Sequence, residues 1–468
     1  MVLKFYNSLT LKKEEFISIN KDKVTLYTCG PTVYNYPHIG NYRCFVFADI
    51  LKRALSYSGY NVDHIMNITD IDDKTIRDSI KEGKSLLDFT QFYTDEFFKD
   101  RDMLSILPPR IYTKATDYVL EMLQITEKLI ENGNAYTTED GSAYFDIKKD
   151  KEYGKLSHFK LSDLKDNASG RLKKDEYEKE NAQDFALWKA WDENDGDVFW
   201  IPSDILGHET KLAKGRPGWH IECSAMSIAT LGEQIDIHTG GIDNMFPHHE
   251  NEIAQSEGAT GKEFVKYWLH CEHLMVDGKK MAKSAGNFYT LRDLIEKNID
   301  PIAFRYWLYT GHYKTKVNFT LESVEGAQTS LDRLYDRYEK LGKNFGSINI
   351  EYKNKFLEFI QDDLNTPRAL ALVWVLLNNE SINNADKKST LQDFDKVLGF
   401  GLADISRNKK KQKEMLKNIP EEVLNIASFR ETARENKDYA QSDKLRDQIL
   451  KLGYEIKDTE SGTEFIKI

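Results

Sequence analysis

The sequence has no apolar run long enough to cross a bilayer, and Met1–Thr10 lacks the apolar core of a secretion signal. These absences predict a protein of the cytoplasm that does not enter a membrane. Cysteine is scarce, and its wide spacing excludes the disulfide framework of a small secreted domain. In such a chain each cysteine is expected to be buried, to bind metal or to take part in catalysis. The cysteines are Cys29, Cys44, Cys223 and Cys271.

An excess of positive charge is also missing, because 65 Lys and Arg stand against 76 Asp and Glu, which gives a net charge of −11. This weighs weakly against nucleic acid as a partner. It does not exclude one, because phosphate binding needs only a local basic face. The basic run Lys409–Lys413 is by itself best interpreted as a solvated linker. Internal repeats are lacking too, and 468 residues predict a large domain with one or two smaller ones.

Two buried strands with a helix between them are predicted near the N-terminus. The strands are Val24–Thr28 and Val62–Ile68, and apolar residues at helical spacing from Phe45 to Leu55 predict the helix. Such a βαβ unit implies parallel strands joined by a right-handed crossover. In sheets of this kind, ligands bind at the carboxyl ends of the strands.

The rest of the chain changes character several times. The charged, irregular stretch Lys148–Asp195 is expected to be an insertion into the α/β pattern. The pattern then resumes with a strand at Gln234–His238 and a helix that starts near Pro247. Leu321–Gly401 is nearly all helical by pattern, and the tail Glu421–Ile468 predicts helices followed by a short β ending.

A first candidate for phosphate chemistry is His38-Ile39-Gly40-Asn41, which follows the first strand and opens the helix. Backbone N–H groups and the positive end of the helix dipole favour an anion there, and Gly40 allows close approach of a base or ribose. His38 and Asn41 can reach the same ligand, and His38 can hydrogen-bond a phosphoryl oxygen as charge develops. For these four residues alone, an ordinary capped helix start is the better explanation.

A second candidate is the lysine-rich loop Lys279–Asn287. Mobile ammonium groups suit a pyrophosphate leaving group, although such a loop alone is more often an exposed basic turn. Together the two segments resemble the HIGH and KMSKS motifs of class I aminoacyl-tRNA synthetases, which implies a single ATP site made by both. Asn41 stands where that family usually has a second His, and Ala282 stands where it has Ser. Lys280 and Lys283 are both retained.

A third candidate is a metal site. His248 and Glu252 are four residues apart, so one helix face can present both to the same ion. Cys223 and Cys29 could add thiolates at the carboxyl end of the sheet, and two S, one N and one O make a plausible zinc set. On spacing alone, a zinc site and a solvated acidic helix beside two buried cysteines explain the pattern equally well.

Segments from most of the chain, in order, resemble the cysteinyl-tRNA synthetase family. They are Tyr27–Tyr34, Asn67–Lys74, Gly215–Cys223, Phe246–Glu252, Asp363–Pro367, Lys437–Asp443 and Asp458–Thr463. The resemblance implies one zinc ion per chain, held by Cys29, Cys223, His248 and Glu252, and it implies contact between Lys283 and ATP. It further suggests that Trp219 packs on the substrate side chain and that Thr69 lies in its pocket, although Trp219 could equally be a core residue.

Two segments depart from the family pattern. Phe465 stands where the family commonly has Trp, and Ser203–Lys214 is longer than the usual link into the Gly215–Cys223 segment. A further candidate, Asp243, rests on analogy with the carboxylates of dinucleotide sites and would accept a ribose hydrogen bond. A loop-capping role is the more common explanation of such an Asp.

The predicted fold is α/β: a Rossmann-like parallel-sheet catalytic domain with an insertion, then an all-α helical bundle and a small C-terminal domain. The resemblance implies that this last domain binds the anticodon, although a salt-bridged helical hairpin is the better explanation of the tail on sequence alone. The expected catalytic domain is residues 1–320, with the insertion at about 130–205 and a stem-contact segment at about 275–320. The bundle is expected at 321–401, and the linker and anticodon-binding domain at 402–468.

The expected activity is that of a cysteine-tRNA ligase. ATP with Mg²⁺ activates L-cysteine to cysteinyl-adenylate, and tRNA-Cys then accepts the cysteinyl group on its terminal ribose. His38, Lys280 and Lys283 are the expected catalytic residues, because they can stabilise charge on the phosphates. Zinc binds the substrate thiolate, which a serine hydroxyl cannot imitate, so no editing domain is needed. The enzyme is expected to act as a monomer.

Two rival functions remain open from the sequence. A ligase that joins cysteine to an amino sugar would have a similar catalytic domain, but it would not need the region from Leu321 to Ile468. A zinc-stabilised RNA-binding or regulatory protein without activity would not need to retain His38, Lys280 and Lys283 together with a metal set.

Overall fold

The computed structural model describes residues 2–158, 184–281, 287–405, 438–459 and 462–467, together with residues 423, 426–427, 429–430 and 433–434. The chain divides into two compact units. One comprises Met1–Leu291 with Pro301–Leu402, and the other comprises Arg292–Asp300 with Ala403–Ile468.

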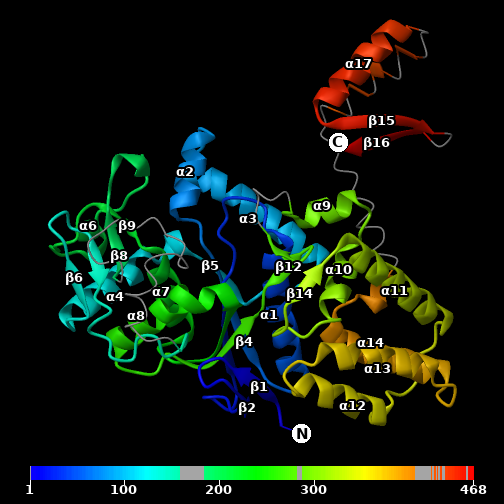
Figure 1. Ribbon diagram of the computed structural model, residues 1–468, viewed down its shortest axis with the longest axis horizontal. Helices are drawn as coiled ribbons and strands as arrows, with labels where there is room; N and C mark the ends of the chain where they lie inside the picture. The colour runs from blue at the N-terminus through cyan, green and yellow to red at the C-terminus, as the bar shows by residue number, and fades with distance from the viewer. Residues whose placement is uncertain are drawn as a thin grey trace. The chain divides into compact units, whose positions relative to one another are not determined.

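The first unit is built on a five-stranded sheet with the order β11-β10-β3-β4-β5, in which every neighbouring pair is parallel (Figure 1). The chain enters at the central strand β3 and adds strands first on one side and later on the other. This reversal is a topological switch point, where ligands bind outside the carboxyl ends of the strands. The strands are β3 (Val24–Thr28), β4 (Val62–Ile68), β5 (Ile111–Lys114), β10 (Ile235–Gly241) and β11 (Val265–Cys271).

The predicted parallel α/β core is thus confirmed, and its helices account for the crossovers between strands. Helix α1 leads from β3 to β4, and its inner face is almost wholly buried. The helices of this core are α1 (Ile39–Tyr57), α2 (Asp73–Lys81), α3 (Leu86–Met103), α4 (Val119–Glu131), α7 (Trp219–Leu231) and α8 (Glu250–Thr260). A single π-helical turn, η4 (Met245–His249), precedes α8, so this helix begins three residues later than expected.

A four-stranded antiparallel sheet interrupts the core between α4 and α7. Gly215 and Gly218 are needed where its last strand passes β8, because a Cβ on either would lie 2.0 Å from a carbonyl oxygen. Strand β9 runs directly into α7 and so fixes where that helix starts. The strands are β6 (Ala135–Thr137), β7 (Ala143–Phe145), β8 (Phe185–Ala190) and β9 (Gly215–Pro217), and the short helix α6 (Pro202–Leu206) lies between the last two.

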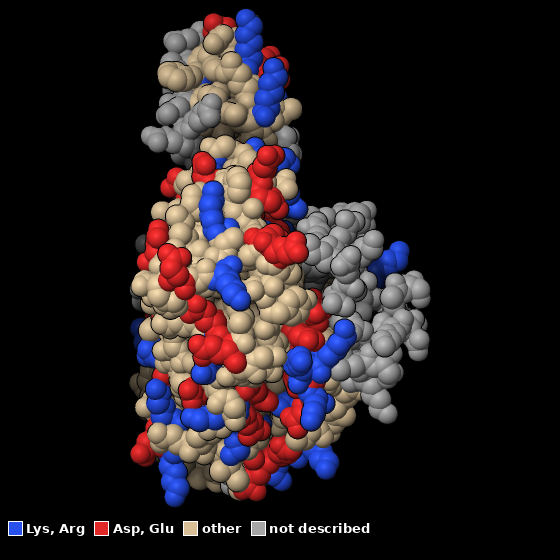
Figure 2. Space-filling view, turned by 90° about the vertical axis from the view of Figure 1, so that its left-hand side faces the viewer, with Lys and Arg blue, Asp and Glu red and all other residues tan. Residues whose placement is uncertain are grey.

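Figure 2 views the side of the molecule on which α4, α6 and β6 lie in Figure 1. Lys and Arg are interspersed there with Asp and Glu, and neither sign dominates the coloured surface. The excess of acidic residues therefore does not form a single acidic patch on this side. A surface that mixes both charges favours solvation over binding of a charged partner.

A smaller sheet with the order β13-β12-β14 follows the core, and it carries the start of the lysine-rich loop. Its strands are β12 (Leu274–Val276), β13 (Lys279–Lys280) and β14 (Val317–Phe319). The unit also contains the N-terminal hairpin β1 (Lys4–Asn7) and β2 (Lys12–Glu15), and helix α10 (Pro301–Leu308). Helix α9 (Leu291–Glu296) begins at the boundary between the two units.

Four helices complete the first unit, as predicted for Leu321–Gly401. They are α11 (Leu321–Lys340), α12 (Ile350–Gln361), α13 (Thr366–Asn378) and α14 (Asn384–Leu398). Helix α14 packs on α1, where the Tyr57 hydroxyl donates to Asp393 at 2.5 Å. Among the described helices, none is long and apolar enough to cross a membrane.

The second unit is small. Helix α17 (Tyr439–Lys451) packs against an antiparallel hairpin of β15 (Tyr454–Thr459) and β16 (Gly462–Lys467), which agrees with the predicted β ending. Val423, Ile449 and Ile456 form its buried core. The side chain of Phe465 lies outside the described residues, and so does the run Lys409–Lys413.

Candidate active site

Four donor atoms gather at the carboxyl end of the sheet. The sulfurs of Cys29 and Cys223, a nitrogen of His248 and a carboxylate oxygen of Glu252 all lie within 4.8 Å of one another. Cys29 follows β3, Cys223 lies on α7, and the other two lie on η4 and α8. The four side chains are at most 8% exposed. The structure thus brings together, from three parts of the chain, the residues that the resemblance marks as metal ligands.

The chemistry of this donor set fits zinc. His248 Nε2 is 3.1 Å from Glu252 Oε1, and Cys29 Sγ is 4.0 Å from the same oxygen. A hydrogen bond from Cys223 lowers the pKa of the Cys29 thiol to about 6, although burial opposes this. A cysteine that ionises readily is a good zinc ligand, and a Cys₂HisGlu set supplies the soft sulfur and borderline nitrogen that zinc accepts.

Histidines that the sequence analysis did not single out surround this set. His238, on β10, places Nε2 2.8 Å from Glu252 Oε2, and His249 places Nε2 3.3 Å from Cys29 Sγ. With Cys29 and Glu252, these two form an overlapping second donor set. His249 Nδ1 lies 2.8 Å from His270 Nε2, and His248 Nδ1 lies 2.9 Å from His220 Nδ1. Partners of this kind orient metal-binding side chains.

A signal for these histidines was present in the sequence. His238 lies on β10, three residues before that strand ends at Gly241. His270 lies on β11, one residue before that strand ends at Cys271. The carboxyl ends of parallel strands meet at one edge, so polar residues there converge. His249 follows a predicted ligand directly. The π-helical turn brings both adjacent imidazoles, His248 and His249, to the cluster, which a regular helical pattern does not predict.

One cleft joins the metal cluster to both candidate ATP segments. It encloses about 770 Å³, including space open to solvent. Its lining includes Cys29, Gly30, His38, Gly40, Asn41, Gly241, Asp243, Lys280 and Met281. Residues about 240 positions apart in the sequence therefore face one space, as a shared ATP site requires.

Backbone contacts join the first candidate ATP segment to the residues that directly follow the lysine-rich loop. Ile39 N donates to Tyr289 O at 2.9 Å, and His38 forms a β-bridge with Thr290. Asn287 Nδ2 donates to Lys280 O at 3.2 Å, which closes the loop between them. Lys280 itself is exposed on β13. Lys283 and Ala282 lie outside the described residues.

The start of α1 makes the contacts expected of an ordinary helix cap. His38 Nδ1 accepts from Asn41 N at 3.1 Å, and Asn41 Oδ1 accepts from His38 N at 3.0 Å, which is a reciprocal capping box. A Cβ on Gly40 would lie 2.7 Å from Met281 Cε and 3.0 Å from the His38 ring, so a side chain there would displace Met281. The cap holds both side chains at the cleft, so capping and ligand binding are compatible here.

The predicted substrate residues lie beside the metal cluster. The Trp219 ring stacks on that of His248, with centroids 4.3 Å apart. Thr69 is buried, accepts from Asn67 Nδ2 at 3.0 Å and exchanges backbone hydrogen bonds with the segment after Cys29. Glu222 was not predicted; it is 1% exposed, and burial and nearby Asp carboxylates raise its pKa well above the usual value.

Asp243 is exposed in η3 (Ile242–Asn244), directly after β10. A Cβ on Gly241 would lie 2.4 Å from its Oδ1, so the carboxylate turns back over the end of the strand. This position at the topological switch point suits a ligand hydroxyl. The η3 segment has no side-chain cap among the described residues, which weakens the loop-capping explanation.

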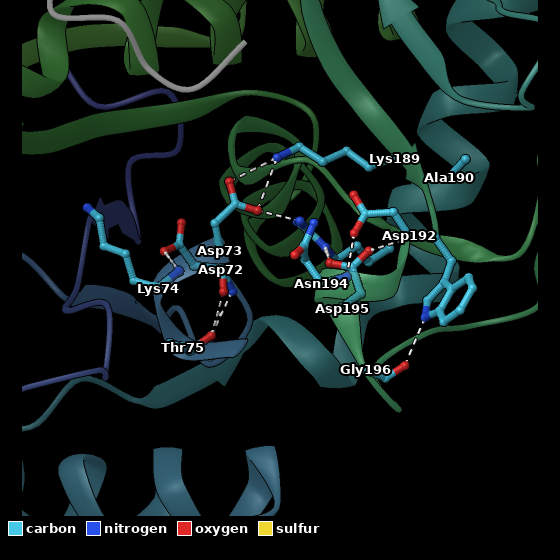
Figure 3. A network of polar contacts seen from close by, with 12 residues as sticks. Asp72, Asp73, Lys74, Thr75, Lys189, Ala190, Asp192, Asn194, Asp195 and Gly196 are labelled. Carbon is cyan, nitrogen blue, oxygen red and sulfur yellow. Dashed lines mark hydrogen bonds and ion pairs between the residues drawn. The ribbon is translucent and has the colours of Figure 1, made fainter. Parts of the chain in front are cut away.

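A network of charged groups ties α2 to the antiparallel sheet (Figure 3). Asp73 accepts from Lys189 Nζ at 3.1 Å and also pairs with Arg216, which in turn bonds Asp195 at 2.7 Å. Burial opposes ionisation of Asp73, but Arg216 and Lys189 lower its pKa overall. The network holds the turn after Thr69 against β9, the strand that leads to Trp219 and Cys223.

Comparisons with known proteins agree with this geometry. Residues 15–329 match the family model described as tRNA synthetases class I (C) catalytic domain. The chain is 44% identical to the Cysteine--tRNA ligase of Brachyspira hyodysenteriae, with 98% of each chain covered. It is also 44% identical to the Cysteine--tRNA ligase of Chlamydia muridarum, with 100% of each covered.

A solved structure supports the fold alone. Mycobacterium tuberculosis methionyl-tRNA synthetase in complex with methionyl-adenylate is similar with a TM-score of 0.55, at 14% identity, over 85% of this chain and 94% of that chain. At such an identity, the likeness extends to the arrangement of helices and strands and not to the choice of substrate.

Proposed function

The chain belongs to the family of the cysteine-tRNA ligases, within the class I aminoacyl-tRNA synthetases, and we propose that its cleft activates L-cysteine with ATP for transfer to tRNA-Cys. The observation that carries this proposal is the single cleft in which Cys29 of the donor cluster faces His38, Asp243 and Lys280. Two reactants held side by side in one cleft react as if at very high concentration.

In the first step, the carboxylate of cysteine attacks the α-phosphate of ATP, which gives cysteinyl-adenylate and pyrophosphate. His38 donates to a phosphoryl oxygen from the start of α1, and Lys280 and Lys283 balance the charge that develops on pyrophosphate. Gly40 and Asn41 leave space for the nucleotide, and Asp243 accepts from a ribose hydroxyl. Mg²⁺ accompanies ATP. In the second step, the terminal ribose hydroxyl of the tRNA attacks the adenylate carbonyl, and AMP leaves.

Selectivity is proposed to come from the donor cluster. Cys29, Cys223, His248 and Glu252 hold zinc, which when bound supplies an inner-sphere partner for the substrate thiolate that a serine hydroxyl cannot replace. The four side chains are buried, which excludes water from competing for this position. Trp219, stacked on His248, packs on the substrate side chain, and Thr69 lines the pocket from the β4 side.

The second unit is proposed to bind the anticodon of the tRNA. Helix α17 carries exposed Lys444 and Arg446, which suit phosphate contacts. An enzyme that joins cysteine to an amino sugar would not need this unit. The ligase is proposed to work as a monomer.

The test is cysteine-dependent exchange of pyrophosphate into ATP, with serine as the competing substrate and with or without a zinc chelator. The proposal expects exchange with cysteine, almost none with serine, and loss of exchange when zinc is removed. Absence of exchange with cysteine would contradict adenylation. Equal exchange with serine would contradict the role of zinc, and exchange without cysteinylation of tRNA-Cys would favour the amino-sugar ligase.

A further inference from the structure

Two cysteines take no part in the proposed zinc set. Cys44 lies on α1, which begins at His38, and Cys271 is the last residue of β11. Both border the cleft described above. Cys44 is partly exposed to it, whereas Cys271 is 1% exposed. Nothing in the proposed reaction uses either thiol.

The two thiols lie side by side. Gly241 pairs with Cys271 across neighbouring strands, and a Cβ on Gly241 would lie 3.4 Å from Cys44 Sγ. From the other direction, Cys271 Sγ is 4.0 Å from the carbonyl oxygen of Arg43, the residue before Cys44. Interaction between the two thiols contributes to the pKa of each. These contacts place the two cysteine side chains next to each other at the end of β11.

The surroundings make the two thiols unequal. Burial opposes ionisation of Cys271, but the hydrogen bond from Cys44 and the nearby Arg43 guanidinium lower its pKa overall. The same hydrogen bond and burial raise the pKa of Cys44 well above its usual value. A thiol that ionises more easily, next to one that stays protonated, is the arrangement found where one cysteine reacts with an oxidant and a second resolves the product.

We propose that Cys44 and Cys271 form a reversible disulfide when the protein meets hydrogen peroxide, and that this bond disables the ATP side of the cleft. The thiolate sulfur attacks one peroxide oxygen, the O–O bond breaks, and a sulfenic acid and hydroxide result. The second thiol then attacks the sulfenic sulfur, the S–O bond breaks, and hydroxide leaves and takes up a proton to become water. Two thiols lose two electrons and two protons, and the peroxide is reduced to water.

The bond would act on the cleft through two elements. The sulfur atoms of a disulfide lie about 2.0 Å apart, so α1 and the end of β11 must move closer than unbonded thiols require. Helix α1 carries His38, Gly40 and Asn41, and β11 leads to the strands that carry Lys280. A displacement of about 1 Å in groups that position reactants can reduce a rate by about a hundredfold.

The direct test uses the full chain loaded with zinc and treated with limited hydrogen peroxide. Remaining thiols are alkylated, and the protein is digested and analysed by mass spectrometry without reduction. The proposal expects one linked pair of peptides that joins Cys44 to Cys271 and disappears after dithiothreitol. Loss of both free thiols without this linked pair would overturn it.

The functional test compares each protein with its own untreated sample. In the wild type, peroxide should reduce cysteine-dependent pyrophosphate exchange by about tenfold or more, and dithiothreitol should restore it. Cys44→Ser and Cys271→Ser should each lose less than about twofold, since neither can form the bond. Zinc content, measured alongside, should stay constant. Equal losses in all three proteins, with release of zinc, would assign the effect to Cys29 and Cys223 instead. Exchange in the untreated wild type tests the proposed function separately.

Discussion

Lys280 stands at the rim of the cleft, exposed on the short strand β13, where its ammonium group can meet a leaving pyrophosphate. We predict that Lys280→Ala lowers kcat for cysteine-dependent pyrophosphate exchange by about a hundredfold, with little change in KM for cysteine. The reason is that charge on the leaving group develops only in the transition state. Lys279→Ala is the matched control, because Lys279 is equally exposed but points to the opposite face of the strand. Equal losses in both variants would contradict this role.

Glu252, like Cys29, belongs to both overlapping donor sets, with one carboxylate oxygen near His248 and the other near His238. We predict that Glu252→Gln weakens zinc binding by at least about tenfold while the fold persists, because the amide keeps the shape but loses the charge. The measurement is zinc per chain by mass spectrometry after dialysis against a chelator, with circular dichroism for the fold. Glu257→Gln, on the same helix but paired with Lys155, should keep its zinc. Undiminished zinc affinity in Glu252→Gln would exclude the carboxylate as a ligand.

The donors themselves could be predicted from the sequence, but their surroundings could not. Spacing put His248 and Glu252 on one face, and the family resemblance added Cys29 and Cys223. His238 and His270 come from separate strands, so their approach depends on the order of strands in the sheet. His38 and Asn41 show a second limit of sequence-based prediction. The sequence offered helix capping and ligand binding as alternatives, whereas in the structure the two residues cap α1 and also line the cleft.

At the scale of elements, a buried ion cluster fastens α1 to its neighbours. Asp49 accepts from Arg53 Nε at 2.8 Å and from the backbone of Leu107 at 2.8 Å, and it also pairs with Arg305 of α10. Burial opposes ionisation of Asp49, but the two guanidinium groups lower its pKa overall. Arg305 also donates to the carbonyl of Leu398 at the end of α14, so a single cluster joins three helices.

We predict that Asp49→Asn lowers the free energy of unfolding by about 3–5 kcal/mol, because it leaves two buried guanidinium groups without their carboxylate. A carboxyl whose pKa is lowered in the folded state stabilises the protein above the pKa of the unfolded chain. That stabilisation is lost as the pH falls through the folded pKa, so the wild type should lose stability below about pH 4 and the variant should lose less. Denaturant unfolding at several pH values measures both effects.

Asp78→Asn is the surface control for this prediction. Asp78 pairs with Arg77 on α2, where the Arg77 side chain is 61% exposed, and its loss should cost under about 1 kcal/mol. A similar loss in both variants, or a wild type whose stability does not respond to acid, would contradict the account of Asp49.

Regular elements were the most predictable part of the fold. Strands β3 and β4 were predicted with their observed bounds because both are short, apolar and bounded by turn residues. The helix after Pro247 was expected too early, because the π-helical turn at Met245–His249 depends on local packing that no periodic pattern reports. The order of the four-stranded insertion sheet was not predicted either, since three of its strands have only three residues and carry too short a pattern.

At the scale of the whole molecule, the division into two units suggests a division of labour. Every described residue of the cleft lies in the unit formed by Met1–Leu291 and Pro301–Leu402. Activation of cysteine should therefore need only that unit, whereas recognition of tRNA should also need the second. The two half-reactions can be measured separately, which makes this division testable.

We predict that a chain ending at Leu402 keeps cysteine-dependent pyrophosphate exchange within about threefold of the full chain, because it retains both ATP segments and the donor cluster. Its kcat/KM for cysteinylation of tRNA-Cys should fall by about a hundredfold or more, since contacts with the tRNA far from the reacting group are lost and their binding energy no longer assists transfer. A thermal melt of the truncated chain separates this outcome from misfolding.

A full chain with Lys444→Ala and Arg446→Ala gives a second measure, because it keeps both units while losing two exposed charges of α17. It should show the same selective loss, in smaller degree. Normal cysteinylation by the truncated chain would show that the second unit has no part in tRNA recognition, and loss of exchange in a folded truncated chain would show that the units do not divide the reaction.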